Sequence, residues 1–87
     1  MKMTREQVQQ LIAKERDYQD SKWGRLEDRP REVGTWITLL GKFITDAQIA
    51  YCCSVGDMQA LSEIRKVAAL AFACLEQHGA PSRRSEI

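Results

Sequence analysis

The chain has 87 residues, enough for one domain, and a chain this short buries only about 60–65% of the surface that its unfolded form exposes. Its formal net charge is +1, so no overall field attracts nucleic acid or an anionic membrane. The polar N-terminus carries no apolar signal core, and no apolar run approaches the roughly 20 residues that span a bilayer. We therefore expect a cytoplasmic protein.

The first predicted helix covers about residues 4–18. Thr4 followed by Gln7 is the pattern of a capping box. The apolar stripe that follows is narrow, which predicts a helix lying on a surface. Residues 24–34 form a predicted loop, because two glycines, a proline and mixed charges gather there.

The second predicted helix covers about residues 35–53, and its apolar positions fall on more than one face. Its main stripe comprises Trp36, Leu39, Leu40, Phe43, Ala47, Ala50 and Tyr51. Further apolar residues on other faces are Ile37, Ile44 and Ile49. A helix of this kind needs more than one neighbour, and 44% of the whole chain is hydrophobic. Both observations predict a homodimer or a higher oligomer.

The third predicted helix covers about residues 58–78. Asp57 is expected to cap its start, and Gly79 is expected to end it. Its apolar stripe comprises Leu61, Ile64, Val67, Ala68, Ala71, Phe72 and Leu75. The turn before it is short, so the second and third helices should form an antiparallel hairpin. The predicted fold class is all-α, with one helical domain over residues 1–80 and a polar tail over residues 81–87.

The three cysteines, Cys52, Cys53 and Cys74, lie in predicted helices beside apolar residues. Their number is odd, no Cys-x-x-Cys pair occurs, and His78 is the sole histidine. This pattern disfavours a disulfide framework or a zinc site and predicts buried free thiols in a reducing compartment. His78 falls at a helix C-terminus, where a partial positive charge is favourable.

Trp23 stands beside Lys22, just before the predicted loop. The indole could stack on a base or a sugar while the ammonium meets a phosphate. Alternatively, the indole clamps the first helix onto the hairpin. The loop adds Arg25, Arg29 and Arg31 as candidate phosphate contacts near the mouth of any pocket.

Two pairs of opposite charges lie at helical spacing. Lys42 and Asp46 are four residues apart on the second helix, and Glu63 and Lys66 are three apart on the third. In an antiparallel hairpin the two pairs could meet and form one patch of two cations and two carboxylates. The alternative is two separate solvated ion pairs, each worth a few tenths of a kcal/mol.

Residues 15–24 resemble the opening ER-x-x-Q-D-x-K-W-G of short phage-type MazG-like proteins, which belong to the all-α nucleotide pyrophosphohydrolases. Residues 36–40 resemble the start of the first metal-binding helix of that family, and residues 63–71 resemble the second. Leu75-Glu76 resembles the W-L-E motif that closes it. The resemblance implies a helical hairpin that assembles into dimers or tetramers.

The resemblance also implies a Mg²⁺ site, built from Glu-Glu-x-x-Glu on one helix and Glu-x-x-Asp on the next. In this register the motif positions hold Gly41, Lys42, Thr45, Glu63 and Lys66. Only Glu63 remains as a carboxylate, and Asp46 lies one residue out of register. A lysine repels Mg²⁺, whereas its ammonium can meet a phosphate directly.

These substitutions lead to a non-catalytic hypothesis, with no catalytic residue, no metal ligand and no cofactor. The chain would bind or sequester a nucleotide or a cyclic nucleotide without metal. Its candidate contacts are Lys22, Trp23, Lys42, Asp46, Glu63 and Lys66. The alternative is a homo-oligomeric interaction module that binds itself or a host protein, and an active pyrophosphohydrolase ranks below both.

Overall fold

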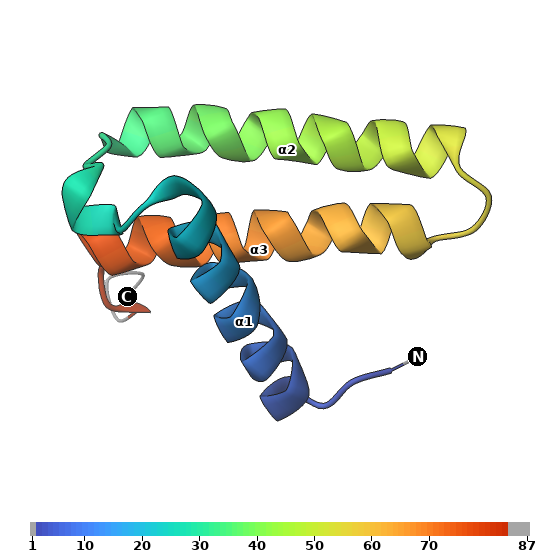
Figure 1. Cartoon of the computed structure of the whole chain (residues 1–87), viewed down its shortest axis with the longest axis horizontal. Coiled ribbons are helices and arrows are strands. Elements are labelled where there is room, and N and C mark those ends of the chain that lie inside the picture. The colour runs from blue at the N-terminus through green and yellow to red at the C-terminus, as the bar shows by residue number, and fades with distance from the viewer. Residues whose placement is uncertain (1, 84–87) are drawn as a thin grey trace.

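A computed structural model describes residues 2–83 of the chain and shows three α-helices, a short 3-10 helix and no strand in that range. The α-helices are α1 (Arg5–Trp23), α2 (Val33–Cys53) and α3 (Met58–His78), and the 3-10 helix is η1 (Leu26–Asp28). Helices α2 and α3 lie side by side and antiparallel, and α1 crosses α3 (Figure 1). The predicted all-α hairpin with an N-terminal helix is confirmed. None of these helices is long and apolar enough to cross a membrane.

The ends of α1 follow from local chemistry. The Thr4 hydroxyl accepts a hydrogen bond from the Gln7 amide at 3.1 Å, and the Gln7 side-chain oxygen accepts one from the Thr4 amide at 2.8 Å. This confirms the predicted capping box. The helix continues past its predicted end at Tyr18 as far as Trp23. It stops at Gly24, whose φ of 94° is open to glycine and strained for other residues.

The bounds of α3 agree with the prediction, but its N-terminal cap does not. The Gly79 amide donates to the Leu75 carbonyl at 2.7 Å with φ 75°, as expected of a C-terminal glycine. Asp57 makes no side-chain capping bond. Its backbone lies in the helical region at φ −106° and ψ −7°, whereas a capping side chain needs an extended backbone.

The core lies between α2 and α3 and is small. It centres on Trp36, Leu70 and Ala73. The half-buried apolar residues packed against it are Leu26, Leu39, Leu40, Phe43 and Cys74. The buried apolar side chains of the described chain are Ile12, Trp36, Ala47, Ala69, Leu70 and Ala73. Because half of these are alanines, the hairpin buries little apolar surface by itself.

Helix α1 is held on α3 by charged side chains. The buried Arg16 donates to Glu76 at 2.6 Å and to Asp20 at 3.0 Å. Burial alone lowers the pKa of Arg16, but its hydrogen bonds to both carboxylates and their charges outweigh burial and raise the pKa. Glu15 and Arg65 form a second ion pair at 3.0 Å. These directional contacts set the angle at which α1 crosses the hairpin.

Gln77 ties the segment between α1 and α2 to the hairpin. Its side-chain nitrogen donates to the Leu26 carbonyl at 3.1 Å. Its side-chain oxygen accepts from the Trp36 indole at 2.8 Å and from the Arg31 amide at 3.0 Å. The His78 Nε2 lies 2.6 Å from the Arg31 carbonyl, so the one histidine also anchors this loop.

Replacing Gln77 with alanine should lower the free energy of unfolding by about 2–3 kcal/mol. The substitution removes three hydrogen bonds and leaves the buried Trp36 indole N–H without an acceptor. Urea unfolding followed by circular dichroism measures the change. Gln59→Ala, at an exposed position of α3, is the matched control and should lie within about 0.5 kcal/mol of wild type. Equal stability of the two variants would show that the Gln77 bonds contribute nothing.

The cysteines are free, as predicted, but they are not buried. Cys52 and Cys53 are exposed in the last turn of α2, and Cys74 is half-buried beside the core. The last turn of α2 lies beyond the point where α1 crosses the hairpin, so among the described helices it packs against α3 alone (Figure 1). Apolar sequence neighbours therefore did not imply burial of these thiols.

The predicted stripe of α3 is largely exposed. The residues that α3 buries are Ala69, Leu70 and Ala73, whereas the large members of the stripe face outward. These exposed members are Leu61, Ile64, Phe72 and Leu75. Periodicity identified the shared face correctly. Met3, Val8 and Leu11 lie beside its first half without burying Leu61 or Ile64.

Candidate functional site

A groove of about 320 Å³ opens between the end of α1, the following loop and the hairpin. Its lining residues are Trp23, Arg29, Arg31, Leu39, Phe43 and Leu70. Its volume is at the lower end of the 300–1,000 Å³ typical of small-molecule sites. The groove joins two aromatic rings and two guanidinium groups, which is the combination that binds a planar anion.

Arg29 is held at this groove by the turn that ends α1. One terminal guanidinium nitrogen donates to the Gly24 carbonyl at 2.9 Å. Its Nε is buried and has no hydrogen-bond partner in the described chain. A buried donor left unpaired is costly, so this nitrogen is poised for an acceptor.

Arg31 lies beside Arg29 and stacks on the core. Its guanidinium sits 5.0 Å from the centre of the Trp36 ring. Burial lowers the pKa of Arg31, and the positive charge of Arg29 lowers it further. Within residues 2–83, neither arginine forms an ion pair with a carboxylate. The groove therefore holds two neighbouring cations that lack an internal counter-ion.

Trp23 forms a wall of the groove and remains partly exposed, at 37%. The Lys22 ammonium lies 5.5 Å from the Trp23 ring centre and 5.9 Å from that of Tyr18. Lys22 does not line the groove but covers one aromatic face beside it. Trp23 is thus placed both to contact a ligand and to close the end of α1 against the hairpin.

The four charged residues predicted on the hairpin form two pairs, each within one helix. Lys42 bonds Asp46 at 2.9 Å on α2, and Lys66 bonds Glu63 at 2.9 Å on α3. No ion pair joins one helix to the other through these side chains in the described chain. Lys42 also lies 4.4 Å from the ring centre of Phe43, which lines the groove. Lys42 therefore neighbours the groove, and none of the four charged residues lines it.

The acidic side chains of the described chain are dispersed. Across residues 2–83, no three histidine, cysteine or acidic side chains gather in a way that could hold a metal ion. Asp46 and Glu63, the two acidic groups of the sequence motif region, are each bound to a lysine.

Some residues of the site were not singled out from the sequence. Phe43 and Leu39 were expected to belong to the apolar stripe, and Gln77 carried no signal because its three bonds reach distant parts of the chain. Arg29 and Arg31 were flagged only as members of a basic loop. The contact of this loop with the end of α3 holds Arg31 at the groove, and that contact leaves no local pattern in the sequence.

Family models, curated proteins and solved structures were all compared with this chain, and none of them matches it.

Proposed function

We propose that this chain binds a nucleotide or a cyclic nucleotide without a metal ion and without hydrolysing it. The observation that carries the proposal is the pair Arg29 and Arg31, which face an aromatic groove and have no carboxylate partner in the described chain. Resemblance of the N-terminal segment to phage-type MazG-like proteins supports the same ligand class. A protein of this kind would sequester its ligand.

The two guanidinium groups are suited to a phosphate or a phosphodiester. Each guanidinium is planar and can donate two parallel hydrogen bonds to phosphate oxygens. An anion would also relieve the repulsion between the two arginines and satisfy the buried Nε of Arg29. The binding energy then comes from groups already in place, so no metal is needed to bridge protein and phosphate.

The aromatic walls are suited to the base. Trp23 and Phe43 contribute rings to the groove, and base stacking on such rings is worth about 1–3 kcal/mol per base. Lys22 and Lys42 lie over these two rings and add positive charge at the rim. Stacking tolerates different bases, so we expect the phosphate arrangement to set specificity more than the base.

A thermal-shift experiment with mono-, di-, tri- and cyclic nucleotides tests the proposal, each with Mg²⁺ and with EDTA. At 100 times its dissociation constant, a ligand adds about 2.7 kcal/mol to the free energy of unfolding. That change raises the melting temperature of a domain of this size by about 10–20 °C. We expect a shift that persists in EDTA and a ligand recovered intact. Inorganic phosphate serves as a control for simple anion binding. The absence of a shift with every nucleotide would contradict the proposal.

Arg29→Gln and Arg31→Gln should each weaken nucleotide binding by about 10- to 100-fold, because each removes a charge-assisted hydrogen bond worth about 1.5–3 kcal/mol. Isothermal titration calorimetry measures the dissociation constants. The matched control is Arg25→Gln, in the same loop but exposed and paired with Glu27. If the control loses as much affinity as the two groove variants, binding reflects general positive charge and the groove is not the site.

The second candidate function is the homo-oligomeric interaction module. One observation favours it: large apolar side chains of α2 and α3 are exposed. A module that binds itself or a host protein through this surface would not respond to nucleotides. The thermal-shift experiment therefore separates the two functions.

A further inference from the structure

Arg29 and Arg31 are fixed close together by the rest of the chain. A terminal nitrogen of Arg29 donates to the Gly24 carbonyl at 2.9 Å. The backbone of Arg31 is held at its amide by Gln77 and at its carbonyl by His78. Burial and then the charge of Arg29 lower the pKa of Arg31, which places the two guanidinium groups near each other. The groove therefore presents two positive charges that are already positioned for one anion.

The charge of these two arginines matches a phosphomonoester better than a phosphodiester. Within residues 2–83 neither of them is paired with a carboxylate. A phosphomonoester carries a charge of about −1.5 to −2 at pH 7, because its second pKa is about 6. A phosphodiester, including the ring of a cyclic nucleotide, carries a single negative charge. Two unpaired guanidinium groups are therefore balanced by one monoester.

The length of the groove suits a single nucleotide. Arg31 stacks on Trp36 near the start of α2, and Phe43 lies seven residues beyond Trp36. That separation is about 10 Å along the helix axis. One nucleotide spans a comparable length from its phosphate to the far edge of its base. The volume of about 320 Å³ is at the low end for small-molecule sites, so the groove accommodates one base and one phosphate.

A longer phosphate chain fits this end of the groove less well. A di- or triphosphate would bring more negative charge next to Asp28 and Glu32, which flank the two arginines in the sequence. Arg25 and Lys42, two further basic side chains nearby, already have carboxylate partners. Lys22 lies over two aromatic rings. Because the proposed function uses no metal ion, the charge of the additional phosphates would stay unneutralised.

We propose that the groove holds a nucleoside monophosphate, whose doubly charged phosphate lies between Arg29 and Arg31. This inference rests on the proposed function and narrows it to one ligand class. A guanidinium can donate two parallel hydrogen bonds to phosphate oxygens. A monoester offers three unbridged oxygens to the two guanidinium groups, whereas a cyclic phosphodiester offers two. The base of the same nucleotide then lies on the aromatic walls.

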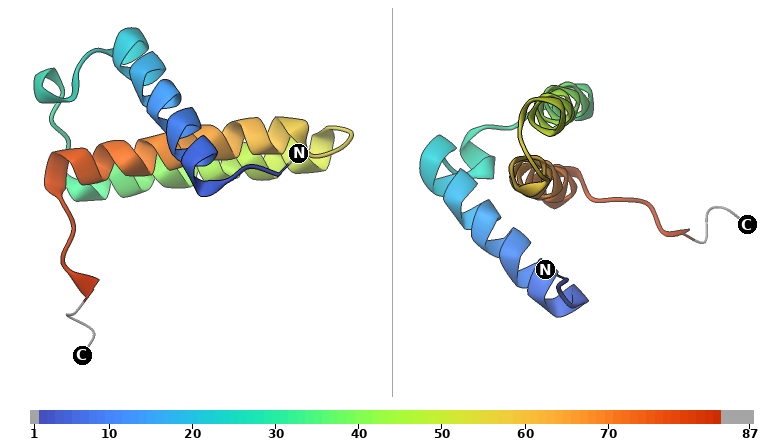
Figure 2. Two further views of the ribbon diagram at one scale, coloured as in Figure 1. Left: turned by 90° about the horizontal axis from the view of Figure 1, so that it is seen from below. Right: turned by 90° about the vertical axis from the view of Figure 1, so that its right-hand side faces the viewer.

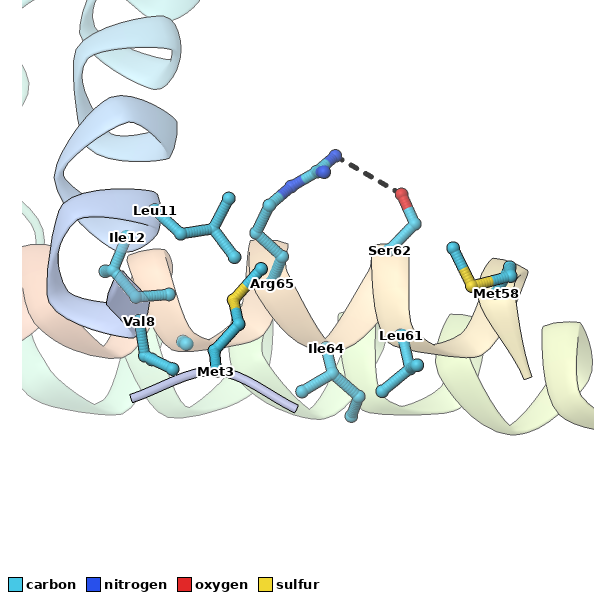
Figure 3. Close-up of a pocket in the computed structure, with 10 residues that line it drawn as sticks. Met3, Val8, Leu11, Ile12, Met58, Leu61, Ser62, Ile64 and Arg65 are labelled. Carbon is cyan, nitrogen blue, oxygen red and sulfur yellow. Dashed lines mark hydrogen bonds between the residues drawn. The ribbon is translucent and has the colours of Figure 1, made fainter. Parts of the chain in front are cut away.

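A second pocket provides the contrast. Figure 2 shows the end of α1 and η1 on the same flank of α3, next to the groove, whereas the second pocket lies at the start of α1. Its volume is about 420 Å³, and Figure 3 shows apolar side chains around it with the Arg65 guanidinium bonded to Ser62. Arg65 also forms an ion pair with Glu15 at 3.0 Å. Of these two pockets in the described chain, only the groove presents arginines without a carboxylate partner.

Calorimetric titration with three adenine nucleotides tests the inference. The probes are adenosine monophosphate, 3′,5′-cyclic adenosine monophosphate and adenosine triphosphate, all in EDTA. They share one base, so differences in affinity report on the phosphate. At pH 7.5 we expect the monophosphate to bind at least about 10-fold more tightly than either of the others, which corresponds to one charge-assisted hydrogen bond.

The pH dependence of the affinities is the second readout. Lowering the pH to 5 protonates the monoester and leaves the cyclic phosphodiester with one charge, so the ratio of their dissociation constants should fall toward one. His78, on the Arg31 carbonyl, is of the one side-chain type whose charge ordinarily changes in this range. The other charged side chains around the groove, of types that ordinarily keep their charge, are Lys22, Asp28, Glu32, Lys42 and Asp46. A change at His78 acts on both ligands, so the ratio isolates the phosphate.

Substitution of the arginines shows whether this pair selects the phosphate. Arg29→Gln and Arg31→Gln should each abolish the preference for the monophosphate, because one guanidinium matches one negative charge. Arg25→Gln, exposed and paired with Glu27, is the control and should keep the wild-type ratio. Arg29→Lys retains the charge and should keep the preference with weaker binding. Circular dichroism checks that each variant is folded.

Three results would overturn the inference, and they separate it from the proposed function. Equal or tighter binding of the cyclic nucleotide or the triphosphate overturns the inference and leaves the proposed function standing. A preference for the monophosphate that survives in Arg29→Gln and Arg31→Gln does the same, because groups other than this pair would then select the phosphate. Failure of all three nucleotides to bind overturns both.

Discussion

The Trp36→Ala variant is expected to lose a large part of the stability of the fold at 25 °C. Trp36 is the largest fully buried side chain of the described chain and the centre of the small core. Truncating a buried tryptophan to alanine costs about 3–5 kcal/mol. A domain of 87 residues has a total stability of only about 4–13 kcal/mol.

The same variant also affects the groove. Without the indole, Gln77 loses a donor and Arg31 loses the ring on which its guanidinium stacks. The loop that carries Arg31 should therefore loosen in the fraction that remains folded. Near-ultraviolet circular dichroism and urea unfolding measure the two effects together.

Trp36→Phe is the control. It keeps most of the apolar volume and removes the indole N–H, so it should cost about 1–2 kcal/mol and remain folded. It also leaves Trp23 as the one tryptophan, whose fluorescence then reports on the groove alone. If Trp36→Ala unfolds no more easily than Trp36→Phe, packing around the indole is not what holds the hairpin together.

The helices could be predicted from the sequence because their signals are local. The Thr4 capping box, the glycine after α3 and the short turn before it each act within a few residues. The end of α1 was misplaced because Asp20 and Ser21 are poor helix formers. In the structure Asp20 bonds the buried Arg16, which keeps the helix intact as far as Trp23.

The candidate site could be predicted only in part, because its contacts are long-range. Trp23 stands out by its neighbours in sequence, and Arg29 and Arg31 by the composition of their loop. What brings them together is Gln77, which is 46 residues from Arg31 along the chain. The lysine pairs formed as expected within each helix, but helical spacing alone does not say which side of the hairpin they occupy.

The stripe on α3 illustrates a related limit. Periodicity shows that Leu61, Ile64 and Phe72 share a face, but it does not show what covers that face. A monomer would hide such a stripe in its own core, whereas this hairpin turns Leu70 and Ala73 inward instead. The exposed stripe is the surface that the second candidate function would use.

Phe72→Asp is expected to dissociate the homo-oligomer of the second candidate function. The substitution places a carboxylate among the exposed apolar side chains of α3, which such an assembly would bury. A central aromatic residue of an interface typically contributes at least about 2 kcal/mol. Each copy of a symmetric dimer carries the substitution, so the dissociation constant should rise by about 1,000-fold or more.

The folded protomer should tolerate this change, because Phe72 is 53% exposed in the single chain. Tyr18→Asp is the matched control, since Tyr18 is similarly exposed but lies on α1, outside the apolar stripe of α3. Sedimentation should give a monomer for Phe72→Asp and the wild-type mass for Tyr18→Asp. An unchanged mass for both variants would place the contact between copies somewhere else.

The second candidate function links assembly to stability. A thin core supplies little stability by itself, so in a homo-oligomer the contact between copies would add to the free energy of unfolding by mass action. The melting temperature of the wild type should therefore rise with protein concentration, whereas that of Phe72→Asp should not. Because Phe72 does not line the groove of Trp23 and Arg31, the Phe72→Asp variant should still bind nucleotide. Loss of binding together with loss of the dimer would instead show that the second copy completes the ligand site.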